Sequence, residues 1–63
     1  MPVITIEGSH MSKEKKAKLV KQVVAAASAV MEISEDTFVT IIRENDYDNI
    51  GNGTQLLSDK LGQ

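Results

Sequence analysis

The order of apolar and polar residues predicts two short strands with one long helix between them. Residues 1–8 begin as a β-branched run and end in a Glu-Gly pair, which is typical of a strand closed by a glycine. Residues 37–43 form a second β-branched run, the strongest strand signal in the chain. Between them, apolar residues recur at steps of three and four, which indicates an amphipathic helix from residue 13 to about residue 31.

The predicted helix has a defined start and two chemically different sides. Ser12 is a good candidate to cap its amino end, and Glu14 places a negative charge in the first turn, where it suits the helix dipole. One side is an apolar stripe made of Val20, Val23, Val24, Ala27, Val30 and Met31. The other side holds five of the seven basic residues, namely Lys13, Lys15, Lys16, Lys18 and Lys21. We interpret this lysine cluster as a solvated helix face.

Strand, helix and strand within about forty residues form a βαβ unit, whose strands are parallel and joined by a right-handed crossover. The expected fold class is α+β, with residues 1–63 as a single domain. Residues 44–49 are polar and turn-forming, and the Gly-Asn-Gly run at 51–53 offers glycines for positive φ. Residues 54–57 are expected to form a short strand or a helical turn, and residues 58–63 a mobile tail.

The chain is too small to bury a full core alone. A domain of this size buries only about 60% of the surface that its unfolded chain exposes, and a chain without cysteine has no disulfide to add stability. A two-stranded sheet under one helix also leaves its edges open and one face bare. Pairing of two copies would cover both, so we expect a homo-oligomer whose subunits share a sheet.

The composition of the chain argues against several classes of partner, metal site and location. The formal net charge is -2, which argues against nucleic acid as the main partner. One His and no Cys are too few for a zinc site built from nitrogen and sulfur ligands. The sequence shows neither a membrane-spanning apolar stretch nor the segments of a secretory signal, so a cytoplasmic location is the default expectation.

Pro2 is the residue with the most distinctive chemistry. Initiator methionine is usually removed before a small residue, which would leave Pro2 with a free secondary amine at the start of a strand. An α-amino group has a pKa of about 7.7–8.0, and burial or nearby positive charge lowers that pKa. A neutral amine can take a proton from carbon or oxygen next to a carbonyl, or attack a carbonyl to form an iminium. Many proteins begin with Met-Pro, so whether Pro2 has a chemical role has to be judged from the rest of the sequence.

Three blocks of sequence supply that context. They are residues 2–8 (PVITIEG), residues 12–16 (SKEKK) and residues 44–53 (ENDYDNIGNG). In this order they resemble the 4-oxalocrotonate tautomerase family, over roughly residues 2–59. The resemblance implies a β-α-β monomer whose sheet is completed by a second subunit, with three such dimers forming a hexamer. It also implies that Pro2 is the general base in keto–enol tautomerisation of small unsaturated 2-oxo acids, without a cofactor or metal.

The rest of the family's site transfers less directly. Ser9 follows the Glu-Gly pair where the best known members have an Arg, and Val39 stands where they have an Arg early in the second strand. Arg43 lies four residues beyond Val39 and so on the same strand face, and we hypothesise that it binds the substrate carboxylate. His10, on the connector after the first strand, is a second candidate for substrate binding. Ile50 takes the place of a family Phe near the Gly-Asn-Gly turn and keeps the site apolar.

Other interpretations stay open. The fold could serve assembly or binding without catalysis, or Pro2 could serve a dehalogenase or decarboxylase of the same fold. Arg43 could be a surface residue paired with a nearby acid, and His10 an exposed loop residue. Lys13 and Tyr47 are weaker candidates for the site, since the first suits a solvated helix turn and the second a subunit interface.

Overall fold

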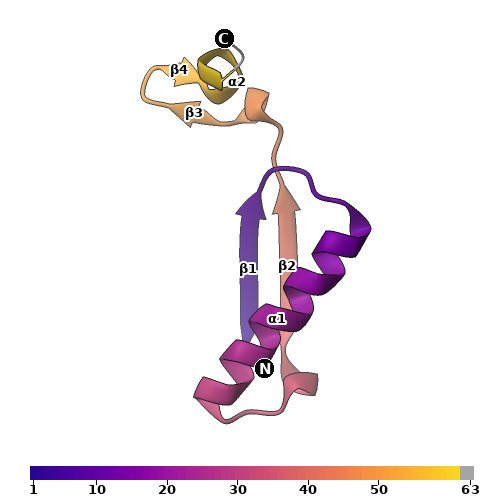
Figure 1. The fold of residues 1–63 in the computed structure, drawn as a ribbon. Helices are drawn as coiled ribbons and strands as arrows, with labels where there is room; N and C mark the ends of the chain where they lie inside the picture. Colours follow the sequence, from indigo (N-terminus) through magenta and orange to yellow (C-terminus); the bar gives the residue numbers. More distant parts are fainter. Residues whose placement is uncertain (62–63) are drawn as a thin grey trace.

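The computed structural model describes residues 1–61 and contains the predicted strand, helix and strand in that order. The elements are β1 (Val3–Gly8), α1 (Lys13–Met31), the 3-10 helix η1 (Glu35–Thr37), β2 (Val39–Glu44), the 3-10 helix η2 (Tyr47–Asn49), β3 (Gly51–Asn52), β4 (Gln55–Leu56) and α2 (Leu57–Leu61). Figure 1 shows two parts: a two-stranded sheet crossed by α1, and a smaller unit beyond the carboxyl ends of the strands. We call this unit, residues 46–61, the C-terminal arm.

The central sheet has the predicted parallel arrangement. β1 and β2 pair in a register that places Val3 beside Val39 and Gly8 beside Glu44. α1 crosses one face of the sheet (Figure 1), and because side chains alternate along a strand, every second strand residue belongs to that face. The half-buried strand residues that form this face are Ile4, Ile6, Gly8, Thr40, Ile42 and Glu44. The fold is thus a β-α-β unit with its helix on one side of the sheet.

The helix α1 begins where the sequence predicts. The Ser12 hydroxyl accepts a hydrogen bond of 3.2 Å from the Lys15 N–H, which caps the amino end. At the other end Glu32 adopts a left-handed conformation, with φ of 58°, and its N–H donates to the Ser28 carbonyl at 2.8 Å. The turn therefore closes in the left-handed geometry that commonly ends helices, although with a glutamate where glycine is usual.

The apolar stripe of α1 is covered over only part of its length. The half-buried apolar residues of the helix are Leu19, Val20, Val23, Val24 and Ala27. Val30 and Met31, which the stripe also includes, are 83% and 50% exposed. The 19-residue helix is about 28 Å long, whereas six-residue strands span only about 20 Å. We therefore attribute the exposure of the last turn to the helix running past the end of the sheet.

The second strand begins later and ends later than predicted. It covers Val39–Glu44 rather than residues 37–43. Thr37 instead closes η1, because its hydroxyl and its N–H both donate to the Ser34 carbonyl, at 2.8 and 3.1 Å. This local hydrogen bonding competes with strand pairing, and a count of β-branched residues does not register it.

The C-terminal arm is more ordered than the sequence suggests. Residues 58–61, predicted as part of a mobile tail, belong to α2, and residues 62–63 lie outside the described residues. β3 and β4 form an antiparallel hairpin, and Gly53 takes a positive φ of 64° in its turn. That confirms the expectation of positive φ at Gly53, while Gly51 does not share it.

The arm is held together by its own contacts. α2 packs against η2 and β4. The Leu57 N–H donates to the Ile50 carbonyl at 2.7 Å, and Lys60 Nζ donates to the Asn52 side chain at 2.9 Å. The arm is therefore a small unit in its own right, attached to the sheet through residue 45.

The face of the sheet opposite α1 is uncovered in the single chain. Val3, Val39 and Ile41 on this face are 53%, 38% and 41% exposed. Within residues 1–61, no side chain is fully buried. No helix in this part of the chain combines the length and apolar character needed to cross a bilayer.

Candidate functional site

Pro2 lies immediately before β1, at the amino end of the sheet. Its carbonyl oxygen accepts a hydrogen bond of 3.0 Å from the Val39 N–H, which ties it to the start of β2. The absence of a proline N–H costs no ladder bond at the first position of a strand. Pro2 is half-buried, and Met1 before it is 87% exposed. The sheet thus fixes Pro2 while Met1 extends into solvent.

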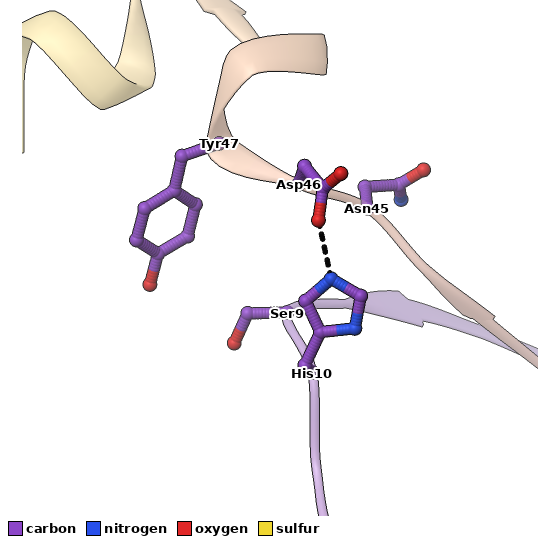
Figure 2. A pocket seen from close by; sticks show the side chains of 5 residues that line it. All are labelled: Ser9, His10, Asn45, Asp46 and Tyr47. Carbon is purple, nitrogen blue, oxygen red and sulfur yellow. Dashed lines mark hydrogen bonds and ion pairs between the residues drawn. The ribbon is translucent and has the colours of Figure 1, made fainter.

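A second group of polar residues gathers at the opposite end of the sheet, where β1 and β2 both finish. The Asn45 N–H donates to the Gly8 carbonyl at 2.8 Å, and its side-chain amide donates to the Glu7 carboxylate at 3.2 Å. These bonds hold the β1–α1 connector, residues 9–12, beside the start of the arm. Figure 2 shows the shallow pocket between them. It is lined by Ser9, His10, Asn45, Asp46 and Tyr47.

Glu44 joins three parts of the chain at this end. Its Oε1 accepts from Lys16 Nζ at 2.8 Å, and its Oε2 accepts from the Met11 N–H at 2.9 Å. The hydrogen bond from Lys16, followed by that from the Met11 N–H, holds the pKa of the Glu44 carboxyl below its ordinary value of 4.5. One carboxylate therefore ties the first turns of α1 and the connector to the last residue of β2.

His10 is surrounded by carboxylates. Its Nε2 pairs with Asp46 Oδ1 (Figure 2), and its Nδ1 lies 3.7 Å from Glu44 Oε2. The hydrogen bond to Asp46, and then the charge of Asp46, raise the pKa of His10 above 6.5, although its side chain is 64% exposed. This negative surrounding favours the charged imidazole but works against binding of an anionic substrate by His10 in the single chain.

Arg43 lies on the uncovered face of the sheet. Its Nη1 is 3.9 Å from Glu7 Oε2, and the two side chains are 61% and 59% exposed. An ion pair this open and this long contributes little to stability. Arg43 therefore has the acidic neighbour that the surface interpretation expects, while its side chain remains largely exposed.

The remaining candidates are spread along the chain. Ile50 is half-buried in the arm, at the end of η2. Tyr47 is 43% exposed and lines the pocket next to His10. Lys13 is exposed in the first turn of α1. Within residues 1–61 no group of three or more His, Asp or Glu side chains is arranged to hold a metal ion.

A single chain does not bring Pro2 together with the substrate-binding candidates. Arg43 pairs in register with Glu7, whereas Pro2 precedes the Val3 pair at the other end. Four residues of strand separate Val39 from Arg43, which is about 13 Å at about 3.3 Å per residue. His10 and Ile50 lie beyond that same far end. A site that combines these residues needs a second copy.

Sequence reasoning did not identify the polar network of Lys16, Glu44 and Asp46. These residues are 28 positions or more from their partners in all three contacts that define it. The available signal was the parallel pairing itself, since parallel strands end at the same edge of a sheet. That rule places the residues after Gly8 next to those after Glu44.

Comparison with known proteins agrees with this architecture. Residues 2–60 match the sequence model of the Tautomerase family, described as tautomerase enzyme. This match, together with the parallel β-α-β unit, places the chain in the tautomerase class. The chain belongs to the tautomerase family. No curated protein sequence matches it.

Solved structures of similar proteins extend over nearly the whole chain. YwhB, a homologue of 4-oxalocrotonate tautomerase, is 29% identical, with a TM-score of 0.86 over 92% of this chain and 97% of that one. The 4-oxalocrotonate tautomerase homologue TTHB242 is 27% identical, with a TM-score of 0.83 over 94% and 95% of the two chains. DmpI from Archaeoglobus fulgidus, at 24% identity and a TM-score of 0.85 over 92% and 100%, shares the fold.

Proposed function

We propose that this protein is a keto–enol tautomerase of small unsaturated 2-oxo acids that uses the amine of Pro2, after removal of Met1, as its general base. Membership of the tautomerase family supports a reaction of this type. The observation that carries the assignment of the base is the position of Pro2, half-buried at the start of β1 and hydrogen-bonded through its carbonyl to Val39. No metal or cofactor takes part in this proposal.

The chemistry requires Pro2 to move one proton. A free α-amine has a pKa of about 7.7–8.0, and burial lowers that value because it disfavours the ammonium form. In the neutral form the nitrogen lone pair takes a proton from the enol hydroxyl or from the carbon next to the carbonyl. The resulting ammonium returns a proton to the other position, so that atoms and charge balance over the cycle.

We propose further that the site forms between copies of the chain. Two copies related by a two-fold axis perpendicular to the sheet would pair their edge strands antiparallel. Such pairing sets the amino end of one copy beside the carboxyl end of its partner. It would therefore place Pro2 near a partner's Arg43 and connector, which a single chain keeps at the opposite end of the sheet.

Among the cationic candidates, Arg43 fits the substrate carboxylate better than His10. The Arg43 side chain is 61% exposed and has one acidic neighbour at 3.9 Å, and a planar guanidinium can bind a carboxylate through two hydrogen bonds. His10 already has Asp46 and Glu44 around its ring. We assign Ile50 the role of an apolar wall. The proposed assembly is a homohexamer, a trimer of such dimers, in which residues 1–63 form one domain.

Ketonisation of a simple enol tests the proposed base. The substrate is 2-hydroxymuconate or phenylenolpyruvate, and its loss is followed by ultraviolet absorbance. We expect protein whose intact mass shows removal of Met1 to be active. Pro2→Ala should have a kcat/KM lower by about 10²–10⁴-fold, the usual contribution of a positioned general base. The pH profile of the active form should report the pKa of the amine.

The matched control is the same chain with Met1 retained. It differs by one residue, and its Pro2 nitrogen is an amide without basicity. Equal activity in the processed, unprocessed and Pro2→Ala proteins would contradict the proposal. If all three proteins are inactive with these enols but each still forms its normal oligomer, the non-catalytic assembly module is favoured. Turnover of a halogenated or decarboxylatable 3-carbon acid that depends on Pro2 would favour the dehalogenase or decarboxylase.

A further inference from the structure

The connection between the sheet and the C-terminal arm lies beside His10. The arm begins at Asp46, directly after the end of β2 and residue 45. His10 lies on the β1–α1 connector, 36 positions away in sequence, and its ring meets the Asp46 carboxylate across the pocket (Figure 2). A side chain of the connector thus contacts the first residue of the arm.

The geometry around the ring distinguishes its two protonation states. Nε2 faces Asp46, and Nδ1 faces Glu44 at 3.7 Å. A neutral imidazole has one N–H and one lone pair, so in that state one of its nitrogens would direct a lone pair at a carboxylate. An imidazolium has two N–H groups and suits both carboxylates. The arrangement therefore matches the protonated ring.

The charged groups that face His10 come from three neighbouring segments. Asp46 belongs to the start of the arm and Glu44 to β2, and both favour the positive ring. Lys16 of α1 opposes it, but its Nζ is paired with Glu44 Oε1 at 2.8 Å. With two carboxylates and one ammonium that is already paired, the net charge around the His10 ring is negative.

We propose that His10 is a pH-operated clasp: as an imidazolium it holds the C-terminal arm to the β1–α1 connector through a charged hydrogen bond to Asp46, and deprotonation, which leaves only a neutral N–H for that bond, loosens the arm. Hydrogen bonds inside the arm, such as Leu57 N–H to the Ile50 carbonyl, do not depend on this contact. The arm therefore moves as a unit about residues 45–46 when the clasp opens. This inference does not depend on the chemistry of Pro2.

The direction of the pH effect follows from the two groups involved. The Asp46 hydrogen bond raises the pKa of His10 in the folded chain above 6.5, so the clasp is complete below 6.5 and is lost as pH rises through the folded-state pKa. The pKa of Glu44 is lowered from 4.5, chiefly by Lys16, so its contribution is complete above 4.5 and is lost as pH falls through the folded-state pKa. Both contributions are complete between pH 4.5 and 6.5.

Nuclear magnetic resonance of the full chain tests the clasp. The His10 ring is titrated through its Cε1–H signal, and the order of residues 47–61 is followed through heteronuclear NOEs over the same pH range. We expect a His10 pKa above 6.5 and a fall in the arm NOEs on its deprotonation. In Asp46→Asn, His10 should hold its proton several-fold less tightly, and the arm should be less ordered already at pH 5.5.

Two further variants keep the result decisive. Asp48→Asn removes the same charge two residues further along, within η2, and should leave both the titration and the NOEs close to wild type. His10→Gln cannot titrate, so its arm NOEs should be independent of pH; this variant carries the test if Asp46→Asn does not fold. An identical His10 titration in wild type, Asp46→Asn and Asp48→Asn, or arm NOEs that ignore the titration of His10, would overturn the clasp.

Discussion

Thr40 places a hydroxyl in an apolar layer. It stands beside Ile4 in the strand register, on the face that α1 covers. Its Oγ1 is buried and has no hydrogen-bond partner within residues 1–61. A buried hydroxyl without a partner loses its hydrogen bonds to water and gains none in return. Thr40 is therefore a point where the sequence gives up stability in the single chain.

We expect Thr40→Val to raise the free energy of unfolding by about 1 kcal/mol, because valine keeps the shape and removes the unpaired hydroxyl. The measurement is the thermal midpoint at a fixed protein concentration, which should rise by several degrees. Thr37→Val is the matched control: the Thr37 hydroxyl donates to the Ser34 carbonyl at 2.8 Å, so its removal should lower the midpoint. A lower midpoint for Thr40→Val would show that its hydroxyl has a partner in the assembled protein.

At the scale of the element, the end of α1 is the position where local geometry and residue type disagree. Glu32 has a φ of 58°, and within the described chain it is the one residue other than glycine with positive φ. The left-handed conformation costs an L residue roughly 1–2 kcal/mol relative to right-handed helix. Glycine at this position avoids that cost, partly offset by its greater freedom in the unfolded chain.

Glu32→Gly should therefore raise the free energy of unfolding by about 0.5–1 kcal/mol. Thermal unfolding followed by circular dichroism should show the gain as a higher midpoint. The control is Glu35→Gly, the same substitution three residues on in η1, where φ is negative and glycine has no advantage. Equal shifts in the two variants would mean that loss of a negative charge, rather than relief of the backbone, is responsible.

The elements that could be predicted from sequence are those specified locally. Ser12 and the apolar repeat were sufficient for both limits of α1, and the β-branched runs for the two strands. The start of β2 was wrong by two residues because Thr37 bonds to Ser34 instead of joining the sheet. The helix α2 was missed because five residues are too few to show a helical period. The family was recognisable from the blocks around Pro2 and Gly53, which the family match confirms.

The site was less predictable because its contacts are not local. Pro2 could be proposed from its place in the sequence alone, and that assignment stays a prediction. The pairing of His10 with Asp46 depends on the register of β1 and β2 and on the path of the arm, which no spacing rule encodes. Whether Arg43 meets Pro2 depends on a second copy of the chain. Sequence patterns thus identified candidate residues but not their neighbours.

At the scale of the whole molecule, the single chain is extended. Its radius of gyration is 15.1 Å, and its principal extents are 44 × 24 × 15 Å. A compact domain of 63 residues would have a radius of about 11 Å. The arm projects from the sheet (Figure 1), and the face opposite α1 exposes Val3, Val39 and Ile41. Since no side chain in residues 1–61 is fully buried, we predict that this face is buried against other copies.

Ile41→Lys tests whether that face is an interface. Burial of an Ile side chain is worth about 1.5–3 kcal/mol, and the substitution also places a charge in the contact, once in each copy. We expect the dissociation constant of the assembly to rise at least about tenfold, and the mass measured by sedimentation to fall toward 6.9 kDa at micromolar concentration.

Gln22→Lys adds the same charge at an exposed position of α1 and should leave the mass unchanged. If Ile41→Lys keeps the wild-type mass, the face is not an interface. If wild-type protein already sediments at 6.9 kDa, both the face contact and a site shared between copies are excluded. If the assembly dissociates and Pro2-dependent activity disappears in parallel, while Gln22→Lys keeps both, the second copy supplies part of the site.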